Sequence, residues 1–293
     1  MLLMNRPTVF IHTNNKQLLG AKVAEYALKS RSQSPDSFDV KILRLEETLH
    51  LYKRQGKDYL RKGKLAKWEN DDLQSFSPLR MMVPQEMNYS GKALVIDPDI
   101  FAVGDVYDLL TLDMQGKSIL CRNIVDGYKS NGNSFYATSV MLLNSDDLMH
   151  WQWDKQIDSM FDKKLDYGPW ISLKLEDPNK IGDLAEEWNH FDTLNELTKL
   201  LHNTERSTQP WKTGLPVDYN TTLGNSRGIP GFFKLFKKQK RYLPHPDIKQ
   251  EQYFLGLLKE CIDKNVIDEK FLLAEISASN LRKDIFQQLE KIN

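Results

Sequence analysis

An apolar run over residues 92–96 ends at two carboxylates, in the sequence Asp97-Pro98-Asp99. Such a run is typical of a buried strand, and open α/β sheets bind their ligands at the C-terminal ends of their strands. Residues two apart on a strand point to the same face, so both carboxylates can approach one cation. Pro98 has no N–H to donate, so regular strand pairing should stop there. Asp-Pro-Asp is also ordinary turn chemistry, and a plain turn is therefore the alternative interpretation.

The N-terminal part of the chain follows a β-α-β order. Residues 8–12 are rich in strand-forming side chains and predict a strand, and residues 13–15 follow as a polar turn and helix cap. Apolar residues recur at helical spacing over 17–30, and residues 39–45 predict a second strand. Two strands joined in this way are expected to pair in parallel through a right-handed crossover.

The remaining segments predict a mixture of further helices and strands. Residues 46–75 are strongly charged with little apolar periodicity, so we expect a helical or mobile insertion there. A helix is expected at 78–89, broken at Pro84. The other expected elements are a helix from Gly104-Asp105 to Leu110, strands at 118–121 and 139–144, a helix containing Trp151, Trp153 and Phe161, a strand or loop near 174–175, an apolar run at 197–201, a loop at 212–230, and two helices within 251–292 split near Asn265.

Composition excludes several classes of protein. The 293 residues carry 40 basic and 40 acidic side chains, and this balance gives no support for nucleic-acid binding. The first residues turn polar too quickly for a signal peptide, and no apolar run reaches the roughly 18 residues of a membrane span. We therefore expect a soluble, cytoplasmic protein. Cys121 and Cys261 are far apart in sequence and are expected to be inert, buried thiols.

Five short motifs follow one another over most of the chain. The first is Val-Phe-Ile-His-Thr-Asn at 9–14, and the second is Phe-Ser-Pro-Leu-Arg at 76–80. The third begins with Gly-Lys at 91–92 and continues through the apolar run to Asp97-Pro98-Asp99 and then Gly104-Asp105. The fourth is Val-Met-Leu-Leu-Asn at 140–144, and the fifth is Trp188-Asn189 followed by Leu201-His202 and Gln209-Pro210-Trp211. In this order they resemble the family-8 type of retaining glycosyltransferases, the glycogenin-like and galactosyltransferase-like enzymes. The third motif is the most specific.

The resemblance implies an α/β GT-A fold, with a Rossmann-like mixed sheet flanked by helices. It implies a nucleotide-sugar-binding catalytic domain at 1–225 and a C-terminal helical extension at 226–293 packed on it. The implied enzyme is a hexosyltransferase that moves a sugar from a UDP-sugar to a glycan or other acceptor with retention of anomeric configuration. The implied metal is Mn²⁺, with Mg²⁺ as the alternative.

The resemblance also assigns site residues. Asp97 and Asp99 would bind the metal, with His202 as the third ligand. A hard divalent cation prefers carboxylate oxygens and tolerates an imidazole, and it can neutralise the charge that develops on a leaving diphosphate. The residues implied for donor binding are Thr13, Asn14, Arg80, Asp97, Pro98 and Lys212. The alternatives are helix capping for Thr13 and Asn14, an ion pair for Arg80 and a packed histidine for His202.

The chain departs from the family pattern in two places. The family usually has a lysine six residues after the histidine, whereas here Gln209 stands seven residues after His202. Arg206 or Lys212 is expected to supply the missing charge. The family's Asp-Gln pair is also missing, and Asp166 is the nearest candidate for its catalytic aspartate.

Other interpretations of the chain stay open. One is a non-catalytic nucleotide-sugar-binding scaffold, and another is a haloacid-dehalogenase-type phosphatase with Asp97 as nucleophile and Asp99 as acid/base. Residues 231–241 are basic and aromatic, which suggests contact with an anionic membrane and a lipid-linked acceptor, or else a solvated helix. The oligomeric state is open. The other histidines show no metal-ligand spacing and are expected to be structural: His12, His50, His150, His190 and His245.

Overall fold

The structure, a computed structural model, describes residues 6–125, 134–219 and 240–292. The chain forms two compact units, Met1–His202 and Asn203–Asn293. Residues 220–239 lie outside the described part, and with them most of the expected loop at 212–230 and most of the basic segment at 231–241. The expected domain boundary at 225–226 lies there too and stays a prediction.

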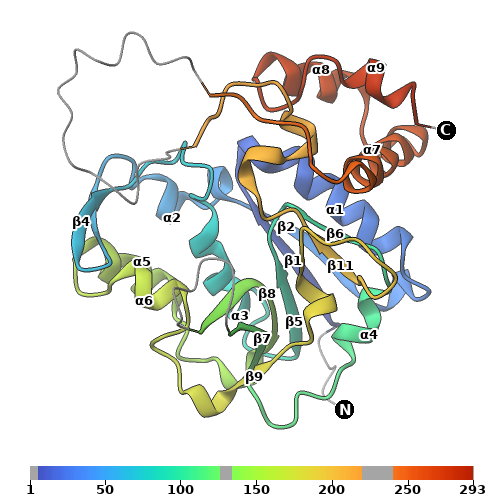
Figure 1. The fold of residues 1–293 in the computed structure, drawn as a ribbon. Helices are drawn as coiled ribbons and strands as arrows, with labels where there is room; N and C mark the ends of the chain where they lie inside the picture. Colours follow the sequence, from blue (N-terminus) through green and yellow to red (C-terminus); the bar gives the residue numbers. More distant parts are fainter. Residues whose placement is uncertain (1–5, 126–133, 220–239, 293) are drawn as a thin grey trace. The chain divides into compact units, whose positions relative to one another are not determined.

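A six-stranded mixed sheet forms the centre of the first unit (Figure 1). The pair β1–β2 is parallel, as expected, and β1–β5 is parallel too. β8 is antiparallel to both β5 and β7, and β9 is parallel to β7. The strand order across the sheet is β2 (Asp39–Arg44), β1 (Thr8–Thr13), β5 (Lys92–Ile96), β8 (Phe135–Asn144), β7 (Ile119–Ile124) and β9 (Ile181–Asp183).

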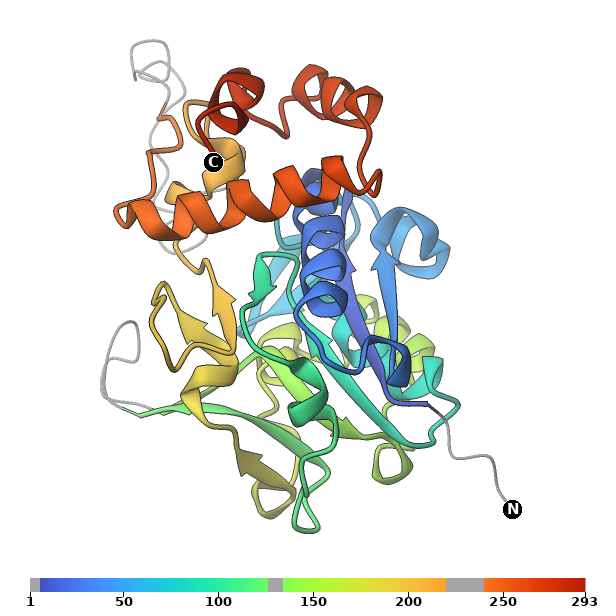
Figure 2. The same cartoon turned by 90° about the vertical axis from the view of Figure 1, so that its right-hand side faces the viewer.

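Helices cover both faces of this sheet. On one face α1 (Leu18–Ser30) contacts β1 and β2, and α4 (Val106–Leu110) contacts β5. Figure 2 shows α1, in blue, running alongside the strands. The opposite face carries η4 (Ser77–Met82), α3 (Val83–Glu86), α5 (Trp153–Phe161) and α6 (Tyr167–Ile171), whose apolar side chains form one buried cluster with alternate residues of β1, β5 and β8. Because successive strand residues point to opposite faces of the sheet, each strand contributes apolar side chains to the packing on both faces.

A smaller three-stranded sheet adjoins the end of β5. It consists of β10 (His190–Phe191), β11 (Leu200–His202) and β6 (Ile100–Ala102), in that order. The remaining short turns of the first unit are η1 (Asn15–Gln17), η2 (Pro35–Ser37), η3 (Leu45–Glu47), η5 (Ser145–Asp147), η6 (Pro178–Lys180) and η7 (Glu186–Asn189).

The charged segment 46–75 is more ordered than its sequence suggested. It contains the short helix α2 (Leu49–Tyr52) and a β-hairpin of β3 (Asp58–Arg61) and β4 (Lys64–Lys67). Lys62 and Gly63 form the hairpin turn, and both have positive φ (52° and 72°), as a type I′ hairpin turn requires. Tyr59 anchors the hairpin, because its ring packs against the rings of Trp68 and Phe161. The expectation of a helical or mobile insertion was therefore wrong over the hairpin.

One further expectation is corrected. Pro84 does not break a helix: it lies in the first turn of α3, where a missing N–H costs nothing. Of the two alternatives for residues 174–175, a strand or a loop, the structure has the loop, and the described strand after it is β9.

The second unit is helical where it is described. It contains η8 (Arg206–Thr208), η9 (Pro210–Lys212), α7 (Ile248–Asp263), α8 (Glu269–Ser277) and α9 (Ile285–Leu289), so the expected two C-terminal helices are three. Asn265, with φ of 55°, follows α7 near the expected break. Cys121 and Cys261 are buried thiols, as expected. Among the described residues, none of the helices is both long and apolar enough to span a membrane.

The burial of β5 predicts a large effect of truncating its core side chains. Leu94 is 0% exposed, so Leu94→Ala should lower the free energy of unfolding by about 2–5 kcal/mol. Leu65 on β4 is 62% exposed, and Leu65→Ala should change stability by less than about 0.5 kcal/mol. Urea unfolding followed by tryptophan fluorescence compares the two, and equal losses would contradict this description of the core.

Candidate metal and donor site

The Asp-Pro-Asp sequence is a turn that connects the two sheets. β5 ends at Ile96, and β6 begins at Ile100. The backbone N–H of Asp97 still donates to the carbonyl of Ser139 on β8, at 3.0 Å. β6 then pairs antiparallel with β11, which places His202 opposite Ile100. The turn and the cation-site interpretations therefore describe the same feature, because this turn carries Asp99 to the side of His202.

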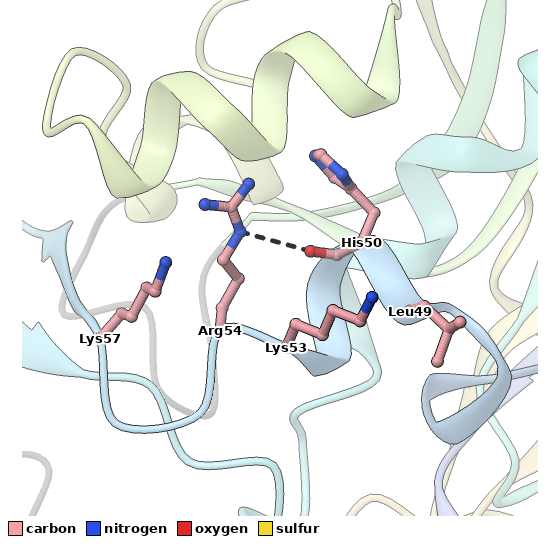
Figure 3. Close-up of a pocket in the computed structure, with 5 residues that line it drawn as sticks. All are labelled: Leu49, His50, Lys53, Arg54 and Lys57. Carbon is pink, nitrogen blue, oxygen red and sulfur yellow. Dashed lines mark hydrogen bonds between the residues drawn. The ribbon is translucent and has the colours of Figure 1, made fainter.

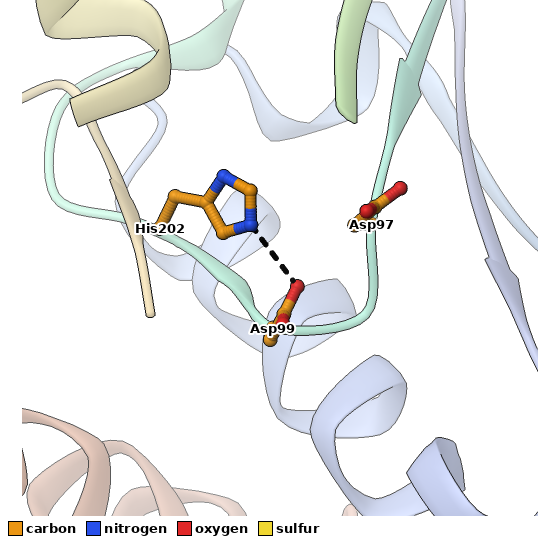
Figure 4. A group of neighbouring side chains, drawn as sticks. All are labelled: Asp97, Asp99 and His202. Carbon is orange, nitrogen blue, oxygen red and sulfur yellow. Dashed lines mark ion pairs between the residues drawn. The ribbon is translucent and has the colours of Figure 1, made fainter. Parts of the chain in front are cut away.

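Asp97, Asp99 and His202 converge on one space (Figure 4). One ligand atom from each lies within 4.8 Å of the others, and His202 Nε2 is 3.5 Å from Asp99 Oδ1. Two ligands of a hard divalent cation, each at about 2.0–2.6 Å, lie at most about 5 Å apart. Two carboxylate oxygens and one imidazole nitrogen thus match both the donor preference and the spacing of such a cation.

Asn189 holds the imidazole of His202 in one orientation. Its amide nitrogen donates to Ser139 Oγ at 3.0 Å and to the carbonyl of Ala137 at 3.4 Å, which turns its amide oxygen toward His202 Nδ1, at 2.8 Å. Since an amide oxygen only accepts, Nδ1 carries a proton, and Nε2 faces the space next to Asp99, where it can carry a second proton or, when His202 is neutral, offer its lone pair to a cation. This arrangement is typical of a metal-ligating histidine. Asn189 belonged to the sequence motif, but nothing in the sequence indicated this role.

Opposing influences set the pKa of His202. Burial by itself lowers this pKa, but the carboxylates of Asp99 and Asp97 outweigh burial and raise it above its ordinary value. The space between these three side chains therefore favours positive charge, whether a proton or a metal ion supplies it.

Asp97 is held by two donors on a single oxygen. His12 Nε2 lies 2.6 Å and Arg80 Nη2 lies 2.9 Å from Oδ1 of Asp97. Arg80 also donates through Nη1 to Thr138 Oγ1 at 2.6 Å. Burial would raise the pKa of Asp97, but Arg80 and His12 lower it to about 2. Asp97 is therefore ionised, and these bonds leave its second oxygen for a cation.

His12 was not expected at the site. It is 0% exposed, and burial, assisted by Arg80, lowers its pKa despite the adjacent Asp97. Neutral His12 thus donates its Nε2–H to Asp97. The strand register explains the contact: Ile11 pairs with Ile96 in the parallel β1–β5 ladder, so the next residues along each strand are His12 and Asp97.

Thr13, Asn14 and Arg80, which were assigned to donor binding, are all buried. The Asn14 side chain caps η1 by accepting from the N–H of Lys16, and it donates to Ser75 Oγ. Helix capping therefore occurs, and a uridine contact stays a prediction. Arg80 does form an ion pair, but a buried one with a proposed metal ligand.

Asp166 joins the β3–β4 hairpin to α6. Its carboxylate caps α6 by accepting from the N–H of Gly168 at 2.8 Å, and it accepts from the N–H groups of Lys62 and Gly63 at 2.8 and 2.6 Å. Burial raises its pKa, but these three backbone bonds outweigh burial and lower it. These contacts give Asp166 a structural role, and its catalytic assignment stays a prediction.

Lys212 and Arg206 belong to the second unit. Lys212 is 0% exposed, and its Nζ lies 2.7 Å from Asp218 Oδ2. The guanidinium of Arg206 lies over the ring of Tyr219, 5.9 Å from its centroid. The idea that either side chain replaces the missing family lysine stays a prediction.

A basic cavity of about 420 Å³ lies beside α2 (Figure 3). Its lining residues include none of the Asp97-Pro98-Asp99 turn. Lys53, Arg54 and Lys57 line it together with Leu49 and His50. A carboxylate partly neutralises this cavity, because Asp158 forms an ion pair with Arg54 and also lies 3.0 Å from Nε2 of His50.

Solved glycosyltransferases share this architecture. The structure is similar to the glycosyltransferase GlyE of Streptococcus pneumoniae TIGR4, with a TM-score of 0.51 and 15% identity over 90% of this chain and 64% of that chain. This chain thus spans just under two thirds of GlyE. Weaker similarity extends to the galactosyltransferase LgtC, solved with donor and acceptor sugar analogues (TM-score 0.46, 14% identity, 70% of this chain and 89% of that chain). It also extends to mouse xyloside xylosyltransferase 1 (TM-score 0.40, 12% identity, 67% of this chain and 97% of that chain).

No family model matches the chain, and no curated protein matches its sequence. The likeness to GlyE is a likeness of fold. It confirms the α/β GT-A fold expected from the sequence, with a mixed sheet flanked by helices.

The contacts of Asp97 predict a specific acid sensitivity. Because its pKa of about 2 lies below the ordinary value of 3.8, ionised Asp97 adds stability that is present above about pH 4 and is lost as the pH falls toward about 2. The wild-type protein should lose about 2 kcal/mol more over this interval than Asp97→Asn, measured by urea unfolding at each pH. Asp108→Asn, a change at an exposed residue of α4, is the control and should follow the wild type. Parallel curves for wild type and Asp97→Asn would refute the assignment.

Proposed function

We propose that this protein is a metal-dependent glycosyltransferase that moves a sugar from a UDP-sugar to a glycan acceptor with retention of anomeric configuration. The observation that carries the proposal is the convergence of Asp97, Asp99 and His202 at the C-terminal end of β5, within a GT-A fold. Open α/β sheets bind ligands at this end of their strands.

Each residue of the cluster has a distinct role in this proposal. Asp97, through its second oxygen, Asp99 and His202 Nε2 would hold Mn²⁺ or Mg²⁺. A cation bound there would neutralise the charge of the donor diphosphate as it leaves. Arg80 and His12 keep Asp97 ionised and fix its orientation, and Asn189 keeps the lone pair of His202 directed at the same space.

Other assignments extend the proposal to the donor and the reaction. Thr13 and Asn14 would contact the uridine, and Arg206 or Lys212 would contact the diphosphate. Retention would follow if the acceptor attacks from the side on which the diphosphate leaves, with the diphosphate assisting. Asp166 is then the candidate for an additional catalytic carboxylate.

Hydrolysis of a panel of nucleotide sugars tests the proposal directly. Nucleotide release, measured by chromatography with Mn²⁺, Mg²⁺ or chelator, should be slow, metal-dependent and restricted to UDP-sugars. Asp99→Asn should lower it at least about 100-fold, because losing a ligand should exceed the about 10–100-fold effect of losing a partner of a ligand. Asp108→Asn is the matched control and should keep full activity.

The outcomes separate the proposed enzyme from the scaffold. Binding of metal and UDP without release from any donor would favour a non-catalytic nucleotide-sugar-binding protein. If neither Mn²⁺ nor UDP binds, the proposed function is wrong.

The role of Asn189 predicts an effect on metal affinity alone. Asn189→Ala frees the imidazole of His202 and should weaken Mn²⁺ binding about 10–100-fold in titration calorimetry, with no loss of the folded state by circular dichroism. Asn144→Ala, at the far end of β8, is the control and should leave the affinity unchanged. Equal affinities of all three proteins would show that Asn189 does not position the ligand.

A further inference from the structure

A second cavity lies in the first unit, with a lining that includes none of the three side chains of the candidate metal site. It measures about 430 Å³, within the size range of small-molecule sites, and the β3–β4 hairpin, α6 and the start of β8 surround it. The lining residues that matter for its chemistry are Arg61, Lys62, Phe135, Tyr167, Ile171 and Lys174.

Among the described residues, the charged side chains that line the cavity are all positive. Arg61, Lys62 and Lys174 line it, and no acidic side chain does. Within the described residues, none of these three cations forms an ion pair with a carboxylate. Asp166 is not among the lining residues, and its oxygens accept from three backbone N–H groups. The basic cavity beside α2 differs in this respect, because Asp158 neutralises part of its charge.

Arg61 is fixed in place at this cavity. Its guanidinium lies over the ring of Tyr167, 5.0 Å from the centroid, and Nη1 donates to Tyr59 Oη at 3.3 Å. A guanidinium held in this way presents a planar set of donors that suits phosphate or carboxylate. The rings of Tyr167 and Phe135 add apolar surface beside it, and together these features suit a small ligand that is partly apolar and carries an anionic group.

A short chain of hydrogen bonds connects the cavity to Asp97. The hydroxyl of Thr138 donates to the carbonyl of Ile171 in the cavity wall, at 3.2 Å, and accepts from Arg80, which donates to Asp97. β8 also runs past the end of β5, because Ser139 bonds the N–H of Asp97 while the strand begins at Phe135. The cavity wall and Asp97 are therefore linked through only two side chains, those of Thr138 and Arg80.

We propose that this cavity is the acceptor subsite and that it takes an acceptor carrying a phosphate or carboxylate group. The inference rests on the proposed glycosyltransferase function, in which the donor diphosphate belongs to the cation held by Asp97, Asp99 and His202. An independent set of cations on the neighbouring α6 side then serves a second anion. Lys62 and Lys174 attract this anion, and Arg61 orients it.

Binding of sugars with and without an anionic group tests the inference. The probes are glucose, glucose 6-phosphate and glucuronate, and separately UDP with Mn²⁺, each titrated by NMR or calorimetry into the full chain. Wild-type protein should bind at least one of the two anionic sugars at least about tenfold more tightly than glucose. Which of the two it prefers identifies the anionic group.

Two double variants locate the binding. Arg61→Gln/Lys174→Gln should lose about tenfold or more in affinity for the preferred anionic sugar and keep its affinity for UDP. Because Arg61 also packs on Tyr167, Lys62→Gln/Lys174→Gln, which changes two exposed side chains, is the second test. Lys53→Gln/Lys57→Gln removes the same charge at the other basic cavity and should retain all affinities.

Three results would overturn the inference. The first is anionic sugars binding no better than glucose. The second is both cavity variants retaining full affinity for the anionic sugar. The third is UDP affinity falling in parallel with that for the sugar, since the cations would then serve the donor. If the wild-type protein binds neither UDP nor Mn²⁺, the proposed function is wrong instead. Failure of the acceptor subsite and failure of the proposed function therefore give different results.

Discussion

The largely buried charge of Asp97 is the constraint on which the candidate site depends. A carboxylate at the end of a central strand needs partners, since breaking a buried ion pair costs about 3–5 kcal/mol. Arg80 and His12 are these partners, and they come from η4 and β1. The same guanidinium bonds Thr138 on β8. One ion pair therefore orients a proposed metal ligand, attaches η4 to the sheet and connects the site to the neighbouring cavity.

Much of the fold followed from local patterns in the sequence. The strands at 8–12, 39–45 and 92–96 and the helix between the first two were predictable because burial on a sheet or a helix face imposes periods that a short window shows. The hairpin at 58–67 escaped notice because its stability comes from Tyr59 packing on Trp68 and Phe161, which the local charge pattern hides. Positive φ at Lys62 left no clear signal either.

The three side chains that converge at the candidate site were predictable from the sequence, but the residues that hold them in place were not. Asp97, Asp99 and His202 were expected from motif order, and the structure brings them together. His12 and Asn189 act through contacts that depend on strand register and on the direction of an amide, and one sequence determines neither. Once the register is known, the contact of His12 follows directly, since parallel pairing of Ile11 with Ile96 extends to the next residue of each strand. The hydrogen-bond partners of Asp166 and Lys212 likewise emerge only from the structure, because they come from other segments of the chain.

The Asp97-Pro98-Asp99 turn joins strands of two different sheets, and this has a mechanical consequence. Asp97 follows the last residue of β5 in the large sheet, Asp99 precedes β6, and His202 ends β11 in the small sheet. A cation bound by all three would cross-link the two sheets at one point. Because such a ligand binds only the folded arrangement, it would suppress local opening of the β10–β11–β6 sheet and slow amide hydrogen exchange there. His202 is also the last residue of the first unit, so the cross-link would anchor the chain where that unit ends.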